Sequence, residues 1–247
     1  MFEKDRLSSL FVIIAQPRSG STLLADSLHR HPNIICHDEI FSETVVHGYR
    51  PKDGTNIPQP SKLLVERNND PEQFLCNYIL PDKESGIQIG FKVVYSDLFA
   101  ANSLAKFLMK FILSENIRVI HLRRLNQLRC FVSVERMRRL GVVHSNNSSQ
   151  SSSLLDLDKD GFLKFLLMQD GNSDFVSRSM NTIAQPRYEH LRQGYNVCLD
   201  ALGVRRFPFS EGLERMSSQS LSDSVSNAPS WYKWDFPRPS GFVQYTD

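Results

Sequence analysis

Short apolar runs alternate with segments of helical periodicity along most of the chain. Continuous apolar runs are typical of strands that are buried on both faces of a parallel sheet. Strands are predicted at 10–15, at 33–41 (where a turn follows the strand), at 87–95 and at 117–122. Helical spacing predicts helices at 22–29, 103–113, 125–140, 162–168 and 195–202. Strands that alternate with helices predict an α/β fold, with one parallel sheet flanked by helices in a single domain of 247 residues.

Two segments depart from this pattern and are expected to form loops or lids. Residues 48–85 carry several prolines, and residues 144–180 open with the serine-rich stretch "HSNNSSQSSS". Polar stretches of this kind bury little apolar surface and tend to be irregular. Because binding specificity usually lies on loops, both segments are predicted to line the pocket for a substrate.

The first predicted strand runs into the small-residue turn "AQPRSGST" (15–22) and then into a helix. Backbone N–H groups and a helix N-terminus in such a turn can hold a phosphate group. Against the nucleoside-triphosphate loop GxxxxGK[ST], Ala15 replaces the first glycine and Ser21 replaces the lysine. Gly20 and Thr22 are retained, and Arg18 can restore a positive charge from the opposite side of the turn. The turn is therefore predicted to bind a phosphate without hydrolysing a triphosphate.

Charge and cysteine content narrow the class of protein. A net charge of +2 is too balanced for a general nucleic-acid binder, but arginines cluster between 123 and 139. That cluster indicates either an anionic ligand with several phosphates or a solvated helix face. The apolar run near the N-terminus is too short to span a membrane. Four widely spaced cysteines without a CxxC pair favour neither a zinc site nor disulfides, so a cytoplasmic location is expected.

A second segment, "VIHLRRLNQLRCFVS" (119–133), is a predicted strand that ends in two arginines and is followed by a serine. Guanidinium groups suit a terminal phosphate that ATP lacks. Together with "PRSGSTLL", this segment resembles the sulfotransferases that use 3′-phosphoadenosine 5′-phosphosulfate (PAPS). The form of the motif is most similar to the bacterial branch that includes trehalose 2-sulfotransferase. "HPNIICHDEIFSE", "GFKVVYSDL" and "YEHLRQGYNVCLDALGV" agree with that resemblance, which extends in patches over residues 10–205.

The resemblance implies the P-loop sulfotransferase fold, PAPS as donor, adenosine 3′,5′-bisphosphate (PAP) as product, and no metal. It implies an acceptor hydroxyl on a carbohydrate, a glycolipid or a small metabolite, and it is compatible with a homodimer. Either Arg123 or Arg124 would bind the 3′-phosphate together with Ser133. The 5′-phosphosulfate would be held by Arg18, Ser19, Gly20, Ser21, Thr22 and Leu23.

The acceptor hydroxyl needs a general base, because an alcohol is a poor nucleophile at neutral pH. Glu39 best matches the glutamate that serves as base in the trehalose-type branch, and His37 is its rival. Both could also be ordinary polar residues of a loop. Lys92, on the third predicted strand, could assist near the sulfate, pair with Glu39, or form a structural salt bridge.

Two other functions are considered. An ATP-dependent phosphotransferase would require a lysine at position 21 and an acidic partner for Mg²⁺ at the end of a strand. A catalytically inactive nucleotide-binding module would keep Arg18 and Ser133 but would not need Glu39.

Overall fold

The computed structural model describes residues 4–51, 58–80, 86–140, 155–209 and 225–226. Its centre is a five-stranded sheet in which all neighbouring strands are parallel, in the order β2-β3-β1-β4-β5. The strands are β1 (Leu10–Ala15), β2 (Ile34–Cys36), β3 (Gln88–Val94), β4 (Arg118–Leu122) and β5 (Thr182–Ala184). All six residues of the central strand β1 are buried, as expected for a strand with both faces covered. The predicted fold class is confirmed.

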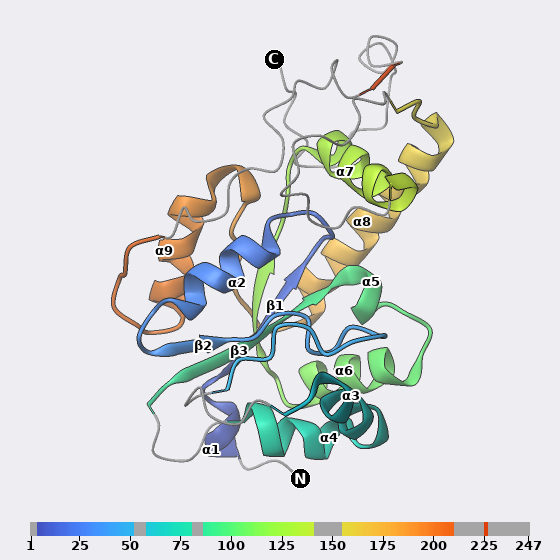
Figure 1. Ribbon diagram of the computed structural model, residues 1–247. Coiled ribbons are helices and arrows are strands. Elements are labelled where there is room, and N and C mark those ends of the chain that lie inside the picture. The colour runs from blue at the N-terminus through green and yellow to red at the C-terminus, as the bar shows by residue number, and fades with distance from the viewer. Residues whose placement is uncertain (1–3, 52–57, 81–85, 141–154, 210–224, 227–247) are drawn as a thin grey trace.

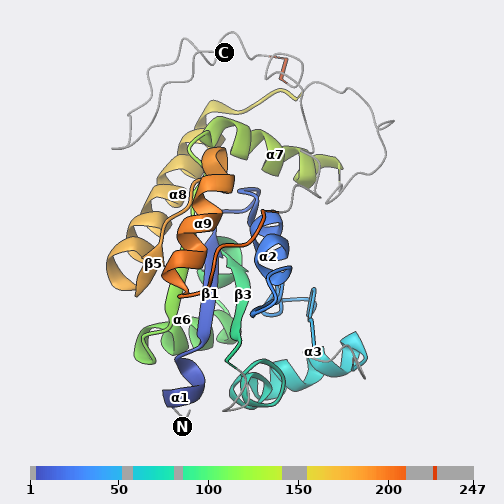
Figure 2. The same cartoon turned by 90° about the vertical axis from the view of Figure 1, so that its left-hand side faces the viewer.

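Helices cover both faces of this sheet (Figures 1 and 2). On one face, α2 and α9 pack against alternate residues of β1, such as Phe11 and Ile13. On the other face, Val12 and Ile14 contact a core built from α3 to α6 and the end of α8. The helices are α1 (Lys4–Leu7), α2 (Ser21–His29), α3 (Pro60–Asn69), α4 (Pro71–Phe74), η1 (Leu75–Ile79, a π-helical turn), α5 (Tyr95–Leu98), α6 (Ser103–Ser114), α7 (Gln127–Leu140), α8 (Lys159–Ser179), η2 (Tyr188–His190, a 3₁₀ turn) and α9 (Leu191–Ala201).

The first segment predicted as a loop, 48–85, is helical over much of its length. α3, α4 and η1 follow one another from Pro60 to Ile79. The prolines mark the starts of helices instead of breaking them, because Pro60 and Pro71 each lie in a first turn, where no N–H is needed. Residues 52–57 and 81–85 lie outside the described residues. A role of this segment at the acceptor pocket stays a prediction.

In the second segment, 144–180, the predicted helix at 162–168 is present, but it extends in both directions into residues that were predicted as a loop. α8 runs from Lys159 to Ser179, and the side chain of Asp158 caps its N-terminus by accepting from the N–H groups of Asp160 and Gly161. The buried face of α8 includes polar residues, so its apolar periodicity is weak outside the predicted 162–168. Residues 144–154 lie outside the described residues. Strand β5 was missed because it has three residues.

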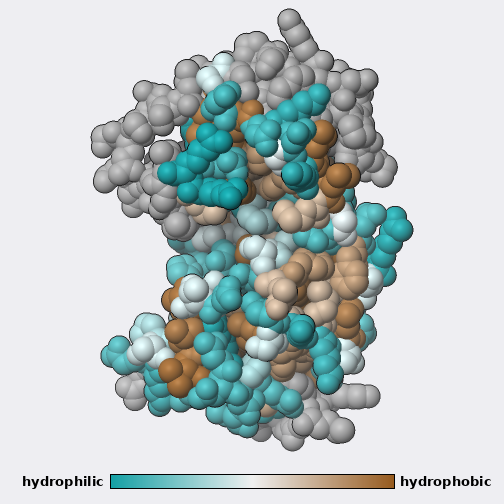
Figure 3. All heavy atoms as spheres, turned by 90° about the vertical axis from the view of Figure 1, so that its right-hand side faces the viewer, coloured by the Kyte–Doolittle hydropathy of each residue, from teal (hydrophilic) through white to brown (hydrophobic). Residues whose placement is uncertain are grey.

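The face shown in Figure 3 presents hydrophobic residues next to hydrophilic ones. Among the exposed apolar side chains of the chain are Leu167 and Met168 of α8. Within the described residues, no helix combines the length and the apolar character that a membrane span requires.

The close packing of β1 on β3 yields a test of the core. Gly90 is paired with Phe11, and a Cβ at Gly90 would lie 2.2 Å from Cζ of the fully buried Phe11 ring. Gly90→Ala is therefore expected to lower the free energy of unfolding by about 1–3 kcal/mol, as overpacking does. Gly171→Ala, in α8 with open space around the added carbon, should instead raise it by roughly 0.5–1 kcal/mol. Urea denaturation of the two variants measures the contrast, and equal stabilities would contradict this view of the core.

Candidate nucleotide-binding and catalytic site

The carboxyl ends of β1 and β4 form a switch point in the sheet. After β1 the chain passes through α2 toward β2 on one side, whereas after β4 it passes through α7 and α8 to β5 on the other side. Ligands of open parallel sheets bind in the crevice at such a point. The turn 16–20 and the segment 123–126 meet here, so both predicted phosphate-binding motifs lie at one edge of the sheet.

The turn after β1 has a conformation that few residues adopt. Both Arg18, with a φ of 62°, and Gly20, with a φ of 80°, are in the left-handed region. A Cβ at Gly20 would also lie 2.5 Å from the ring of Tyr188, so glycine is needed there for two reasons. The Ser19 hydroxyl donates to the carbonyl of Gln16 at 2.7 Å and closes the turn from inside.

Two buried amides tie this turn to the segment after β4. The side chains of Gln16 and Gln127 exchange hydrogen bonds of 3.1 and 3.2 Å, and Gln16 Oε1 also accepts from the N–H of Arg124 at 3.1 Å. The Cys130 thiol donates to the carbonyl of Pro17 at 3.1 Å. Sequence reasoning missed this pair, because single glutamines 111 residues apart carry no recognisable pattern.

Two arginines and a serine converge beside the turn. Arg124 Nη1 donates to the Arg18 carbonyl at 2.8 Å, and Arg18 Nε donates to the Ser133 hydroxyl at 3.0 Å. The guanidinium of Arg124 lies 4.7 Å from the ring centroid of Tyr188. Burial, together with the neighbouring charge of Arg124, lowers the pKa of Arg18. The buried Nε of Arg124 has no acceptor among the described residues, so this cluster is suited to an anion.

The other arginines between 123 and 139 lie in different surroundings, and some of them belong to a solvated helix face. Arg123 acts electrostatically on Tyr95 and on Asp170 of α8, and thus on a different neighbourhood from Arg124. Arg138 and Arg139 are exposed and pair with Glu135 on the same helix, as on a solvated helix face. Of the two candidates for the 3′-phosphate, the geometry favours Arg124.

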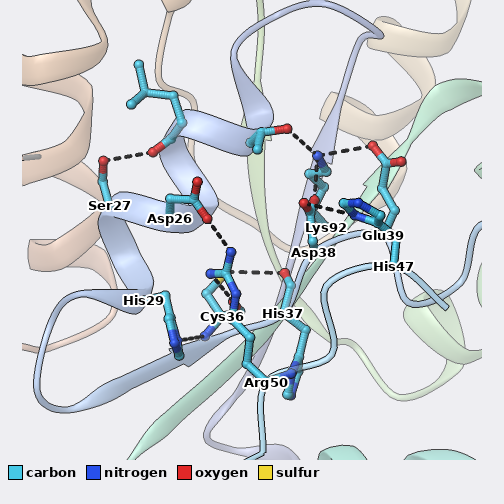
Figure 4. A network of polar contacts seen from close by, with 12 residues as sticks. Asp26, Ser27, His29, Cys36, His37, Asp38, Glu39, His47, Arg50 and Lys92 are labelled. Carbon is cyan, nitrogen blue, oxygen red and sulfur yellow. Dashed lines mark hydrogen bonds and ion pairs between the residues drawn. The ribbon is translucent and has the colours of Figure 1, made fainter. Parts of the chain in front are cut away.

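A second positive group, the ammonium of Lys92, lies at the N-terminus of α2 (Figure 4). Only 3% of this side chain is exposed, and Nζ lies 2.6 Å from Thr22 Oγ1, 2.5 Å from Asp38 Oδ1 and 3.1 Å from Glu39 Oε1. Thr22 is the second residue of α2. β3 thereby supplies a cation to the helix N-terminus, although the turn itself has no lysine. Of the alternatives considered for Lys92, the pairing with Glu39 is present, together with a buried ion pair to Asp38.

The two candidate bases differ in their surroundings. The Glu39 side chain is 30% exposed and forms an ion pair with Lys92, so its carboxylate has a fixed partner and is still accessible to solvent. His37 is buried, its Nδ1 accepts from the N–H of Arg50 at 3.0 Å, and its ring points away from Lys92 in Figure 4. Burial, with the charges of His29 and Arg50, lowers the pKa of His37 to about 3. The geometry therefore favours Glu39, and its role stays a hypothesis.

Asp97 is a further carboxylate near Glu39 that sequence reasoning missed. It lies on α5, directly after β3. Burial raises the pKa of Asp97 to about 6, with contributions from the charges of Glu39 and Glu43, while Arg67 and Lys92 oppose the shift. Its position shortly after a buried strand was the one available signal, and many surface residues share it.

Comparison with known proteins finds a solved structure that is similar to this chain. The chain is similar to a sulfotransferase from Alicyclobacillus acidocaldarius, with 14% sequence identity over 83% of this chain and 85% of that chain and a TM-score of 0.47. No protein-family model and no curated protein matches the chain. A similarity at this level does not define a function, so the function proposed below depends on the residues of the site.

The raised pKa of Asp97 predicts a pH-dependent stability. The folded state binds this proton more tightly than the unfolded state, so its contribution to stability falls as the pH rises from about 4 to about 6. Asp97→Asn removes a charge that is unfavourable above that range. Allowing for solvent screening, we expect the variant to be about 1 kcal/mol more stable than the wild type at about pH 7.5 and equally stable at about pH 4. Urea denaturation of the wild type and the variant at both pH values tests this.

Proposed function

We propose that this protein is a sulfotransferase that moves a sulfuryl group from PAPS to a hydroxyl of an acceptor. The observation that supports this most directly is that positive groups lie on two sides of one turn, a single ammonium on one side and two guanidinium groups on the other. Lys92 lies at the start of α2, and Arg124 lies with Arg18 and Ser133 beside α7. Positive groups at two positions suit a nucleotide that carries phosphate groups at both its 5′ and its 3′ position. The sequence motifs resemble those of enzymes with the same donor.

The residues present fit this donor. The backbone of 19–23 lies at the N-terminus of α2, where an anion is favoured, and Lys92 lies beside it. We assign the 3′-phosphate to Arg124, whose buried Nε has no acceptor among the described residues, and to Ser133. The Arg18 carbonyl accepts from Arg124, the Arg18 side chain donates to Ser133, and the charge of Glu39 also acts on it.

Sulfuryl transfer requires the protein to position the donor and the acceptor and to stabilise developing charge, and it requires no covalent intermediate with the protein. In sulfuryl transfer, the acceptor oxygen bonds to sulfur, the bond from sulfur to the 5′-phosphate breaks, and the hydroxyl proton leaves. Lys92 and Arg18 stabilise the charge that develops on the leaving phosphate, as cationic groups do in phosphoryl transfer. Glu39, on the other side of the Lys92 ammonium, accepts the proton. The acceptor class is a carbohydrate, a glycolipid or a small metabolite.

The contact of Lys92 with Thr22 also bears on the ATP-dependent alternative. In a nucleoside-triphosphatase the hydroxyl at this position binds Mg²⁺. Here the Thr22 hydroxyl accepts a hydrogen bond from a buried ammonium, which occupies the position beside that hydroxyl. This contact disfavours the phosphotransferase. The alternative of a catalytically inactive nucleotide-binding module is tested by the Glu39→Gln variant.

Calorimetric titration with PAP and with ATP tests the donor site. We expect PAP to bind at least tenfold more tightly than ATP, and Arg124→Gln to weaken PAP binding by about 10–100-fold, because hydrogen bonds to charged groups are lost. Arg123→Gln is the matched control and should change the affinity less than about threefold. If ATP bound as tightly as PAP, the phosphotransferase would become the better hypothesis.

Glu39→Gln tests the base. The variant should bind PAP like the wild type, while sulfation of a panel of sugars and alcohols with PAPS should fall by about 10²–10⁴-fold, as expected when a general base is lost. Glu43→Gln, an exposed change on the same loop, should retain activity. Full activity in Glu39→Gln would assign the proton transfer to another residue.

A further inference from the structure

Arg67 of α3 is a fully buried arginine, which is rare for this residue type. Its Nη1 atom lies 2.9 Å from the carbonyl oxygen of Ile40, 2.6 Å from that of Ser42 and 3.1 Å from that of Val45. Nη2 donates to the Glu43 carbonyl at 3.3 Å. One guanidinium thus binds four main-chain carbonyls of a single loop.

That loop begins at the candidate base. The carbonyl of Glu39 accepts from the N–H groups of Ser42 at 3.2 Å and of His47 at 3.2 Å, which closes residues 39–47 into a ring of backbone. The chain has no helix or strand in this range, so no regular ladder of hydrogen bonds defines its shape. The Arg67 guanidinium donates hydrogen bonds to the loop carbonyls that point toward it, and these carbonyls need such a partner inside the protein.

The charge of Arg67 is compensated by the dipoles of the main-chain carbonyls and of the Asn68 amide, and by the nearby carboxylate of Asp97. The Asn68 side-chain oxygen accepts from Nε at 3.1 Å and from Nη2 at 2.9 Å, so the plane of the guanidinium is fixed. Burial lowers the pKa of Arg67, and the charge of Asp97 opposes this. A lysine could not replace this arrangement, because its single nitrogen cannot reach four carbonyls in one plane.

We propose that Arg67 is a positioning residue for sulfuryl transfer, which holds the loop 39–47 so that the Glu39 carboxylate stays at the Lys92 ammonium. The inference rests on the proposed function. Glu39 is partly exposed, so packing of its own side chain does not fix it. Its backbone is fixed by the ring that Arg67 fills, and α3 thereby takes part in the chemistry without contacting either substrate.

The test separates donor binding from turnover. In Arg67→Met, PAP affinity by calorimetry should stay within about twofold of the wild type, while turnover of PAPS should fall by at least about 100-fold, as expected for a misplaced catalytic group. Arg67→Lys should lose about tenfold or more. Lys62→Met, on an exposed position of the same helix, should change neither quantity.

Chemical rescue distinguishes positioning from general structural support. In Arg67→Ala, millimolar guanidinium chloride should restore part of the turnover, whereas ammonium chloride should not. If Arg67→Met keeps turnover within twofold of the wild type, or if PAP affinity and turnover fall together, the proposal is overturned.

A milder variant and a structural readout cover the case in which Arg67 variants do not fold. Asn68→Ala removes the exposed partner that orients the guanidinium, and it should lower turnover several-fold with PAP affinity unchanged. Amide hydrogen exchange of Ser42 and His47, which donate to the Glu39 carbonyl, should be faster in this variant. Unchanged exchange would refute the role of Arg67 in the loop.

Failure of the proposed function has a different outcome from failure of this inference. If the wild type neither binds PAP nor consumes PAPS, sulfuryl transfer is refuted. The exchange measurement then still decides whether Arg67 fixes the loop.

Discussion

The candidate site depends on the buried ammonium of Lys92. Its contacts join three elements that are far apart in the sequence, namely the start of α2 at Thr22, the strand β3, and the loop that carries Asp38 and Glu39. Taking this cation out of water is unfavourable unless its charge is balanced; the Thr22 hydroxyl accepts a hydrogen bond from it, and the carboxylates of Asp38 and Glu39 form ion pairs with it. The same contacts therefore stabilise the fold locally and set the relative positions of the groups proposed to act in transfer.

Much of the fold was predictable from the sequence, because the central strands are buried on both faces and therefore read as continuous apolar runs. β1 was predicted with its observed bounds, and β3 and β4 to within a residue. The errors came where local signals conflict with tertiary context. Proline suggested an irregular segment at 60–79, although proline is also common in the first turn of a helix, and α8 buries polar side chains that obscure its period.

The site was predictable where a motif is contiguous and not where it is assembled by the fold. The turn around Gly20 and the pair of arginines after β4 are local patterns, so they could be found in the sequence. The choice between Arg123 and Arg124 needed the direction of each side chain at the end of a strand. Arg67 gave no signal and Asp97 gave only its position shortly after a strand, since their importance comes from burial beside the loop that follows β2.

The way in which Arg67 holds its loop has a consequence for how such a protein can change over evolution. The guanidinium binds main-chain carbonyls, which every amino acid provides, so it places no demand on the side chains of the loop. Glu43, Thr44 and Val45 are exposed and can be replaced without altering those hydrogen bonds. Mutation can therefore remodel the outer surface of the loop while the backbone beneath Glu39 keeps its shape. New preferences for a binding partner could arise there without loss of the inherited chemistry.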